Sequence, residues 1–147
     1  MIWFQSNSEF IKDKIQKLQK KALRMMSFSE LHESSSPLFK KWKILKIEDI
    51  VEIQNCVFVH SFLKGKLPKS FENFFLRCSD VHTNPTRFSN AESLYMPRCK
   101  SVTYGMNSIT NICINSWNNI TEILEKPSTL SISELKKKMF EMCIAKY

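Results

Sequence analysis

Glycine is scarce in this chain, with only Gly65 and Gly105 among 147 residues. Phosphate-cradling loops of the Walker and dinucleotide-binding types need several glycines close together, so both types are excluded. A turn-rich β-sandwich is disfavoured for a related reason, because its tight turns draw on glycine. The scarcity of glycine therefore removes the common nucleotide-binding loops and argues against one all-β class of fold.

Long apolar runs are also missing. No run approaches the roughly 18 residues needed to span a bilayer. The apolar start from Met1 to Phe4 is soon followed by Ser6, Asn7 and Glu9, and it has neither the basic first region nor the long apolar region of a secretory signal. We therefore predict an intracellular protein, nuclear or cytoplasmic, that is not secreted and has no membrane partner.

Paired cysteines are absent. The five cysteines are scattered and odd in number, and no two form a Cys-x-x-Cys pair. Such cysteines are typical of reduced thiols in an intracellular protein. Cys78, His82 and Cys99 offer three zinc ligands, but the fourth is missing and the spacing fits no standard site. We therefore predict no metal and no other cofactor.

Carboxylates arranged to hold Mg²⁺ are missing as well. The chain has no Asp-Asp pair, and Glu48, Asp49 and Glu52 lie together where a helix is predicted to begin. Polymerases need carboxylates that converge on Mg²⁺ from separated segments, whereas these three suit the positive end of a helix dipole. Most cysteines lie on predicted apolar helix faces, which argues against a Cys–His nucleophile. We therefore predict no catalytic residues and a protein that is not an enzyme.

Apolar residues and positive charge are what the chain does have. Hydrophobic residues make up 43% of the sequence, enough for a packed core. The 22 Lys and Arg exceed the 14 Asp and Glu and give a formal net charge of +8. That excess favours nucleic acid, an anionic membrane or an acidic partner without choosing among them.

The spacing of apolar residues predicts an all-α or mainly α fold. Long helices are expected at 9–28, 47–64 and 131–146, and we expect them to pack together. In all we predict four to five helices in a single domain over 1–147. This domain is helical at 9–77, irregular at 78–107 and helical again at 108–147. The strongest core candidates are Ile50, Val57, Phe58 and Trp117.

Several smaller features refine this fold. A short helix begins at Ser36-Pro37, and another covers about 69–77. Gly65 is expected to end the second long helix, and Ser131 with Glu134 forms a capping box that opens the last one. Within the irregular segment, residues 94–96 and 101–104 are extended pieces that can pair as a short β-hairpin.

Two stripes follow the first long helix. An apolar stripe consists of Ile11, Ile15, Leu18, Ala22 and Met25. Beside it, a basic stripe consists of Lys14, Lys17, Lys21 and Arg24. We expect the apolar stripe to be needed in the core, which disfavours a membrane-bound amphipathic helix.

Further cations lie next to aromatic residues. Lys40, Lys41, Lys43 and Lys46 surround Trp42, and Arg87, Arg98 and Lys100 lie near Phe88 and Tyr95. A row of cations can follow a phosphate backbone, and bases can stack on an exposed ring. The strongest chemical interpretation is therefore non-specific, salt-dependent binding of RNA or DNA. The alternative is a solvated basic face with the aromatic residues in the core.

Short motifs also occur in a particular order along the chain. They are IQKLQKKALR (15–24), SPLFKKWKILKIEDI (36–50), LPKSFENFF (67–75), HTNPTR (82–87), YGMNSI (104–109), WN (117–118) and LKKKMFEMCIAKY (135–147). In this order they resemble the C-terminal region of LINE-type (non-LTR) retrotransposon reverse transcriptases of the jockey and CR1 kind. Two departures are Pro85 within the fourth motif and Asn119-Ile120, where many relatives have Leu-Pro.

The resemblance implies a segment that follows the fingers, palm and thumb of a polymerase. The Tyr-x-Asp-Asp motif and the Mg²⁺ carboxylates would then lie upstream, and Met1 would fall inside the parent reading frame. The chain is accordingly expected to be a non-catalytic fragment that helps to hold template RNA or target DNA. The alternative is a structural or protein-interaction module that packs on the polymerase core and has no independent activity.

Overall fold

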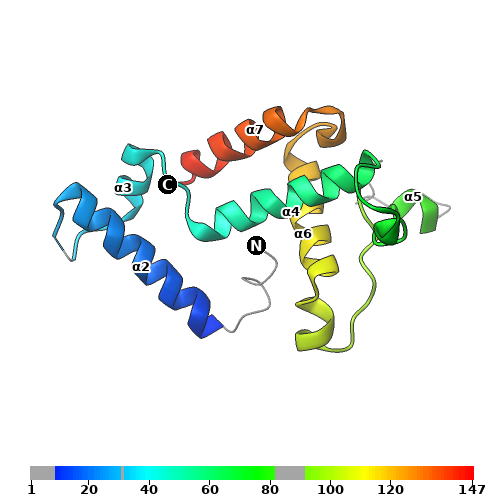
Figure 1. Cartoon of the computed structure of the whole chain (residues 1–147), viewed down its shortest axis with the longest axis horizontal. Helices are drawn as coiled ribbons and strands as arrows, with labels where there is room; N and C mark the ends of the chain where they lie inside the picture. The colour runs from blue at the N-terminus through cyan, green and yellow to red at the C-terminus, as the bar shows by residue number, and fades with distance from the viewer. Residues whose placement is uncertain (1–8, 31, 82–91) are drawn as a thin grey trace. The chain divides into compact units, whose positions relative to one another are not determined.

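The computed structural model describes residues 9–30, 32–81 and 92–147, and these residues are mainly helical (Figure 1). The six α-helices in the described residues are α2 (Glu9–Ser27), α3 (Ser36–Trp42), α4 (Ile47–Leu63), α5 (Cys78–Val81), α6 (Ile109–Ile123) and α7 (Ile132–Ala145). The shorter elements are the 3-10 turns η1 (Lys69–Phe71) and η3 (Pro127–Thr129) and the π-helical turn η2 (Val102–Met106). The mainly α prediction is confirmed, and the number of helices is slightly higher than predicted.

The chain divides into two compact units. The first, here called the terminal unit, consists of Met1–Ile53 with Lys136–Tyr147. The second, the central unit, is Gln54–Leu135. Helices α4 and α7 each have residues in both units. The single domain over 1–147 stays a prediction, because units that share continuous helices can still unfold together.

A small apolar cluster forms the core of the terminal unit. Leu23 of α2 packs with Leu38 and Phe39 of α3, and Ile44 and Tyr147 lie against them. The rings of Phe39 and Tyr147 meet edge to face, with centroids 5.8 Å apart. The end of the described chain is thereby fixed to the α2–α3 pair.

Gln19 fastens α2 to the start of α4. Its Nε2 donates to the carbonyl of Leu45 at 2.8 Å, and its Oε1 accepts from the N–H of Ile47 at 3.1 Å. The first N–H groups of a helix have no partner inside it, so this side chain stabilises the beginning of α4. The side of α2 that carries Gln19 and Leu23 is consequently the side turned toward the rest of the terminal unit.

The expectation that the apolar stripe of α2 belongs to the core is wrong. Ile11, Leu18 and Met25 are 39%, 66% and 68% exposed. Ala22 is exposed as well, and Ile15 is half-buried. The physical reason is that α2 is oriented by Leu23 and the two hydrogen bonds of Gln19, which lie on a different side of the helix. The strongest apolar period in the chain therefore does not coincide with the buried face of α2.

Helix α6 provides the centre of the central unit. Its start is capped by Ser108, whose Oγ accepts from the N–H of Asn111 at 3.4 Å. Its inner side buries Cys113, Ile114, Trp117 and Ile120. Trp117 is wholly buried, and its Nε1 donates to the carbonyl of Glu92 at 3.0 Å. Trp117 is thus confirmed as a core residue.

The other core candidates lie on α4, whose apolar arc is too wide to identify one buried side. Ile50, Val57 and Phe58 are half-buried rather than buried. The buried apolar residues of this helix are instead Val51, Ile53, Cys56 and Val59. Phe58 belongs to a group of five phenylalanines that pack edge to face, with centroids 5.1 to 6.1 Å apart: Phe58, Phe62, Phe71, Phe74 and Phe75.

The predicted β-hairpin of residues 94–96 and 101–104 is not formed. Leu94 makes an isolated antiparallel bridge with Arg77 instead. Both backbone groups of Leu94 also bond to the side chain of Asn118, each at 2.9 Å. Residues 102–106 coil into η2. An extended strand partner is therefore unnecessary, because a side chain of α6 satisfies the same backbone groups.

Two further helix boundaries differ from prediction. The helix expected at 69–77 is reduced to η1, and α5 lies inside the segment expected to be irregular. After Pro68 the backbone hydrogen bonds span three residues. The N–H of Phe71 donates to the carbonyl of Pro68, and the N–H of Phe74 donates to the carbonyl of Phe71. This tighter winding brings Phe71, Phe74 and Phe75 against Phe58.

Two predicted helix termini, the start of α7 and the end of α4, are confirmed. The N–H of Ser131 donates to Glu134 at 2.9 Å, and the N–H of Glu134 donates to Ser131 Oγ at 3.2 Å. This reciprocal pair is the capping box that begins α7. After α4, Gly65 adopts a φ of +63°, a left-handed conformation that favours glycine. The N–H of Lys66 then donates back to the carbonyl of Ser61 at 2.9 Å and closes the helix end.

Candidate nucleic-acid interface

The basic stripe occupies one exposed side of α2. Lys14, Lys17 and Lys21 are exposed, and Lys17 has 77% of its side chain accessible. Residues three and four apart lie above one another on a helix, so these ammonium groups form a row. Arg24 is half-buried, and its Nε donates to the carbonyl of Glu33 at 3.0 Å. The stripe thus offers three open lysines, with a fourth cation partly committed to the fold.

Local partners hold the lysines of the basic stripe only loosely. Lys17 Nζ lies 3.4 Å from the carboxylate of Asp13, and both side chains are largely exposed. Lys14 Nζ lies 4.3 Å from the ring centroid of Phe10, which is itself 66% exposed. Exposed pairs of these kinds contribute little free energy in water. A phosphate can therefore replace either partner at small cost.

A second group of cations lies at the end of α3 and is called the α3 cluster. It consists of Lys40, Lys41 and Lys43, all exposed, around Trp42. Lys43 has a φ of 52°, and this left-handed cap ends the helix directly beside the tryptophan. Trp42 is 45% exposed, and its indole is an aromatic surface on which a base can stack. Its Nε1 donates to Ser27 Oγ at 2.9 Å, which ties the α3 cluster to the end of α2.

Lys46 contacts aromatic rings of the terminal unit and is only partly exposed. Its Nζ lies 4.3 Å from the ring centroid of Tyr147 and 5.9 Å from that of Phe39. The Tyr147 hydroxyl accepts from the backbone N–H of Lys46 at 2.8 Å and donates to the carboxylate of Asp49. Burial and the hydrogen bond to Asp49 raise the pKa of the Tyr147 phenol. Lys46 is therefore set apart from the exposed cations.

The cations of the irregular segment belong to the central unit. Arg98 and Lys100 are exposed there, and Tyr95 beside them is half-buried. Arg87 and Phe88 lie outside the described residues. The basic stripe and the α3 cluster accordingly belong to the terminal unit, whereas Arg98 and Lys100 belong to the central unit.

Three of the cysteines and one histidine are buried in the fold. Cys56, Cys113 and Cys143 are buried. Burial raises the pKa of Cys113 to about 12 and, together with the charge of Asp49, the pKa of Cys143 to about 11. Thiols with such pKa values are poor nucleophiles at neutral pH. His60 is buried, and its Nε2 donates to the carbonyl of Leu130 at 2.8 Å, which is a structural role.

Within 9–30, 32–81 and 92–147, no group of three or more His, Cys, Asp or Glu side chains can hold a metal ion. His82, one of the three zinc ligands considered from the sequence, lies outside the described residues. Nor does any helix of the described chain have the length and apolar character needed to cross a membrane.

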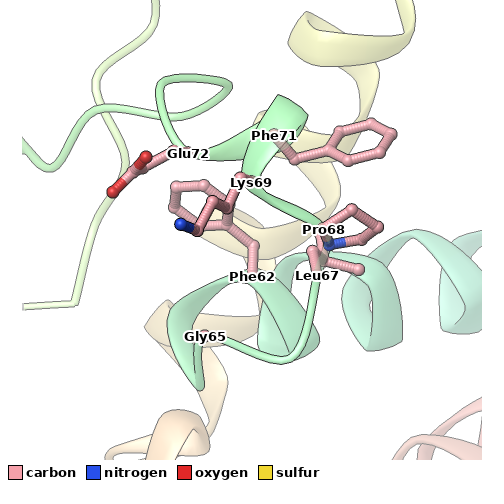
Figure 2. Close-up of a pocket in the computed structure, with 7 residues that line it drawn as sticks. All are labelled: Phe62, Gly65, Leu67, Pro68, Lys69, Phe71 and Glu72. Atoms are coloured by element: carbon pink, nitrogen blue, oxygen red, sulfur yellow. The ribbon is translucent and has the colours of Figure 1, made fainter.

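A cavity of about 250 Å³ lies in the central unit between the end of α4 and η1 (Figure 2). Its walls include the apolar side chains of Phe62, Leu67 and Phe71. Figure 2 shows Phe71 and Glu72 extending in opposite directions from η1. Lys69 and Glu72 are exposed and opposite in charge, so the cavity has no net charge to attract a phosphate. It is not part of the candidate interface.

Several residues of the ordered sequence motifs have clear packing roles. Trp117 and Asn118 hold Glu92 and Leu94 in place. A Cβ atom added at Gly105 would lie 2.5 Å from Cys99 Cβ, so only glycine fits there. Asn111 donates to the carbonyl of Gly105 at 2.9 Å. These contacts explain the residues physically without assigning them a ligand.

Comparisons with protein-family models, curated proteins and solved structures give no match to this chain.

Two features of the candidate interface were missed from the sequence. One is Gln19, whose hydrogen bonds orient α2. The other is the exposure of the apolar stripe next to the basic stripe. A signal for both existed, since Gln16, Gln19 and Leu23 recur at helical spacing and all three are at least half-buried. This row of two glutamines and one leucine is a weaker apolar signal than the five residues of the apolar stripe. The apolar stripe therefore predicted the wrong buried side of α2.

Proposed function

We propose that this chain is a non-catalytic accessory segment that binds nucleic acid through the terminal unit. One observation carries the proposal. Six exposed lysines of the basic stripe and the α3 cluster, Lys14, Lys17, Lys21, Lys40, Lys41 and Lys43, accompany a half-exposed tryptophan in a single unit. Cations of this kind recognise phosphates, and the indole ring offers a stacking surface for one base.

The dimensions of the basic stripe suit a nucleic-acid strand. From Lys14 to Lys21 a helix rises about 10 Å, which corresponds to roughly three phosphates along one strand of a duplex. The ammonium groups contact phosphates without reading the bases, so binding is expected to be non-specific. RNA and DNA are both suitable ligands on these grounds.

The ordered motifs support a more specific origin for this activity. We propose that the segment corresponds to the C-terminal region of a LINE-type reverse transcriptase, downstream of the polymerase domain. In that setting the lysines would hold template RNA or target DNA during target-primed synthesis. The chain itself would contribute binding and no chemistry.

A salt titration with a matched control tests the proposed binding. Fluorescence anisotropy with labelled single-stranded RNA and duplex DNA measures affinity from low to physiological salt. Replacing Lys14, Lys17 and Lys21 with Gln should weaken binding and reduce the slope of log K against log salt by about two to three. The control variant replaces Lys136, Lys137 and Lys138 with Gln, because these three exposed lysines of α7 carry the same charge. Equal losses in the two variants would contradict the assignment to α2.

Protein interaction is the second candidate function, and a specific observation favours it. The apolar stripe of α2 is exposed, with Leu18 and Met25 each about two-thirds accessible. Phe28, immediately after the helix, is 98% exposed. Contiguous apolar surface of this kind marks binding sites for other proteins. In the retrotransposon setting, the occupant would be the polymerase core.

A further inference from the structure

The exposed apolar stripe of α2 has the spacing of a helix-pairing seam. Its residues follow one another at intervals of four, three, four and three, from Ile11 to Met25. This strict alternation keeps one narrow row on the same side of the helix, as in the a and d positions of a coiled coil. The row covers two heptads, enough to dock one short helix.

The two edges of this seam differ. On one edge lie Lys14 and Lys21, both exposed. On the other lies Gln19, half-buried and bonded to the backbone of Leu45 and Ile47. One edge is therefore occupied by the fold of the terminal unit itself, and the open edge is basic.

We infer that the apolar stripe docks an amphipathic helix of a partner protein, and that acidic residues of this helix face Lys14 and Lys21. The inference rests on the second candidate function, protein interaction, and adds the chemistry of the partner. Leu18 and Met25 pack against apolar residues of the incoming helix. The two lysines pair with Glu or Asp at its edge, as at the e and g positions of a coiled coil.

Charge argues against a second copy of this chain as the occupant. In an antiparallel pair, Lys14 and Lys21 of one copy would face the same lysines of the other. In a parallel pair they would face Gln19 and Met26 of the other copy, which offer no negative charge, and Gln19 is already bonded within its own unit. Like charges oppose the antiparallel pairing and the parallel pairing leaves both lysines without a counter-charge, whereas an acidic helix supplies one.

The shape of the exposed side argues against a lipid surface. A helix that lies in a membrane interface has a broad apolar face with its polar face turned to water. Here the apolar side is one row wide between Lys14 and Gln19, a half-buried residue of the folded unit, and the exposed Phe10, Met26 and Phe28 extend it only near its two ends. A narrow seam is matched by another helix better than by a flat layer of acyl chains.

The experiment uses the full chain and a synthetic three-heptad peptide with Leu at a and d and Glu at e and g. Repulsion among its glutamates keeps the peptide from pairing with itself. Binding is measured by fluorescence anisotropy of the labelled peptide. The L18S/M25S variant should bind at least about tenfold more weakly, because two apolar contacts are lost. The matched control is I123S, since Ile123 of α6 is 60% exposed but lies in the central unit.

A second pair of variants tests the acidic edge. K14Q/K21Q should weaken peptide binding and reduce its salt dependence, whereas K136Q/K137Q should change neither. If K14Q/K21Q binds the peptide like the parent protein, the acidic chemistry is refuted while a docking surface remains. If the parent protein does not bind the peptide, the inference is overturned, including the case in which another part of the chain covers the stripe in solution.

Two further outcomes would assign the stripe to other occupants and overturn the inference. One is a dimer in analytical ultracentrifugation that L18S/M25S abolishes. The other is binding to phosphatidylserine vesicles that depends on Leu18 and Met25 in the absence of peptide binding. RNA affinity measured on L18S/M25S keeps the two proposals distinguishable, because the serine substitutions leave all lysines of the basic stripe in place.

Discussion

Helices α2 and α6 are both amphipathic in sequence, and the structure uses their apolar sides in opposite ways. In α6 the apolar side is buried, with Cys113, Ile114 and Trp117 each 1% exposed or less. In α2 the corresponding side is open, with Leu18 and Met25 about two-thirds exposed. The period of the apolar residues predicts which side of a helix becomes buried. It does not predict whether that side is buried within the chain or against another molecule. The open apolar surface on α2 is therefore available to a partner molecule, whereas the apolar side of α6 is not.

The two helices also differ in what fixes their orientation. Around α6, polar side chains bond to backbone from distant segments, as Asn118 does to Leu94 and Trp117 does to Glu92. Around α2, the main such group is Gln19, at one edge of the strongest apolar row and on the side that Leu23 buries. A few satisfied hydrogen bonds, together with Leu23, thus orient α2 against the preference of its own pattern.

The largest expected effect comes from removing the centre of α6. Trp117→Ala should lower the free energy of unfolding by about 3 to 5 kcal/mol, because a large buried side chain and its hydrogen bond to Glu92 are lost together. Urea unfolding followed by circular dichroism measures the loss. A decrease below about 1 kcal/mol would contradict the burial of α6 on which the comparison rests.

A smaller effect is expected from the Tyr147 hydroxyl in the terminal unit. Tyr147→Phe removes the donor to Asp49 and the acceptor for the N–H of Lys46, and it should cost about 1 to 2 kcal/mol near neutral pH. The ring and its edge-to-face contact with Phe39 remain, so the variant should still fold. Urea unfolding at pH 7 measures the change.

The pH dependence of this hydroxyl has a definite sign. Burial and the bond to Asp49 raise the pKa of Tyr147 above its ordinary value of 10.0, so the folded protein keeps a proton that the unfolded chain releases. The stabilising contribution is therefore complete below pH 10 and is lost as the pH rises above it. The difference in stability between the parent protein and Tyr147→Phe should shrink above pH 10. A difference that stays constant or grows there would contradict the buried, hydrogen-bonded state of the phenol.

Sequence reasoning succeeded where the signal was local. The capping box of Ser131 and Glu134 and the helix end at Gly65 depend on residues three or four apart, and both are present as predicted. Exposure of Lys14, Lys17 and Lys21 was likewise predictable, because no long lysine side chain is buried without a partner.

Sequence reasoning failed where a hydrogen-bond partner lies far along the chain. The hairpin at 94–96 and 101–104 was wrong because Asn118, about two dozen residues away, supplies both hydrogen bonds to Leu94. The direction of α2 was wrong because Gln19 bonds to the segment before α4. Neither contact leaves a periodic trace, since a single polar side chain has no period.

The smallest expected effect concerns the apolar stripe itself, and it separates α2 from α6 most sharply. Leu18→Ser with Met25→Ser should change the free energy of unfolding by no more than about 0.5 kcal/mol, because both side chains are already largely in water. Paired serine substitutions at buried apolar residues of α6, such as Ile114 and Trp117, would unfold the central unit. Urea unfolding of the double variant against the parent protein makes the comparison, with Ile123→Ser as the exposed control in α6. A loss of 2 kcal/mol or more, roughly what full burial of such side chains is worth, would mean that the stripe is covered within the chain, and a partner helix would then have no surface to occupy.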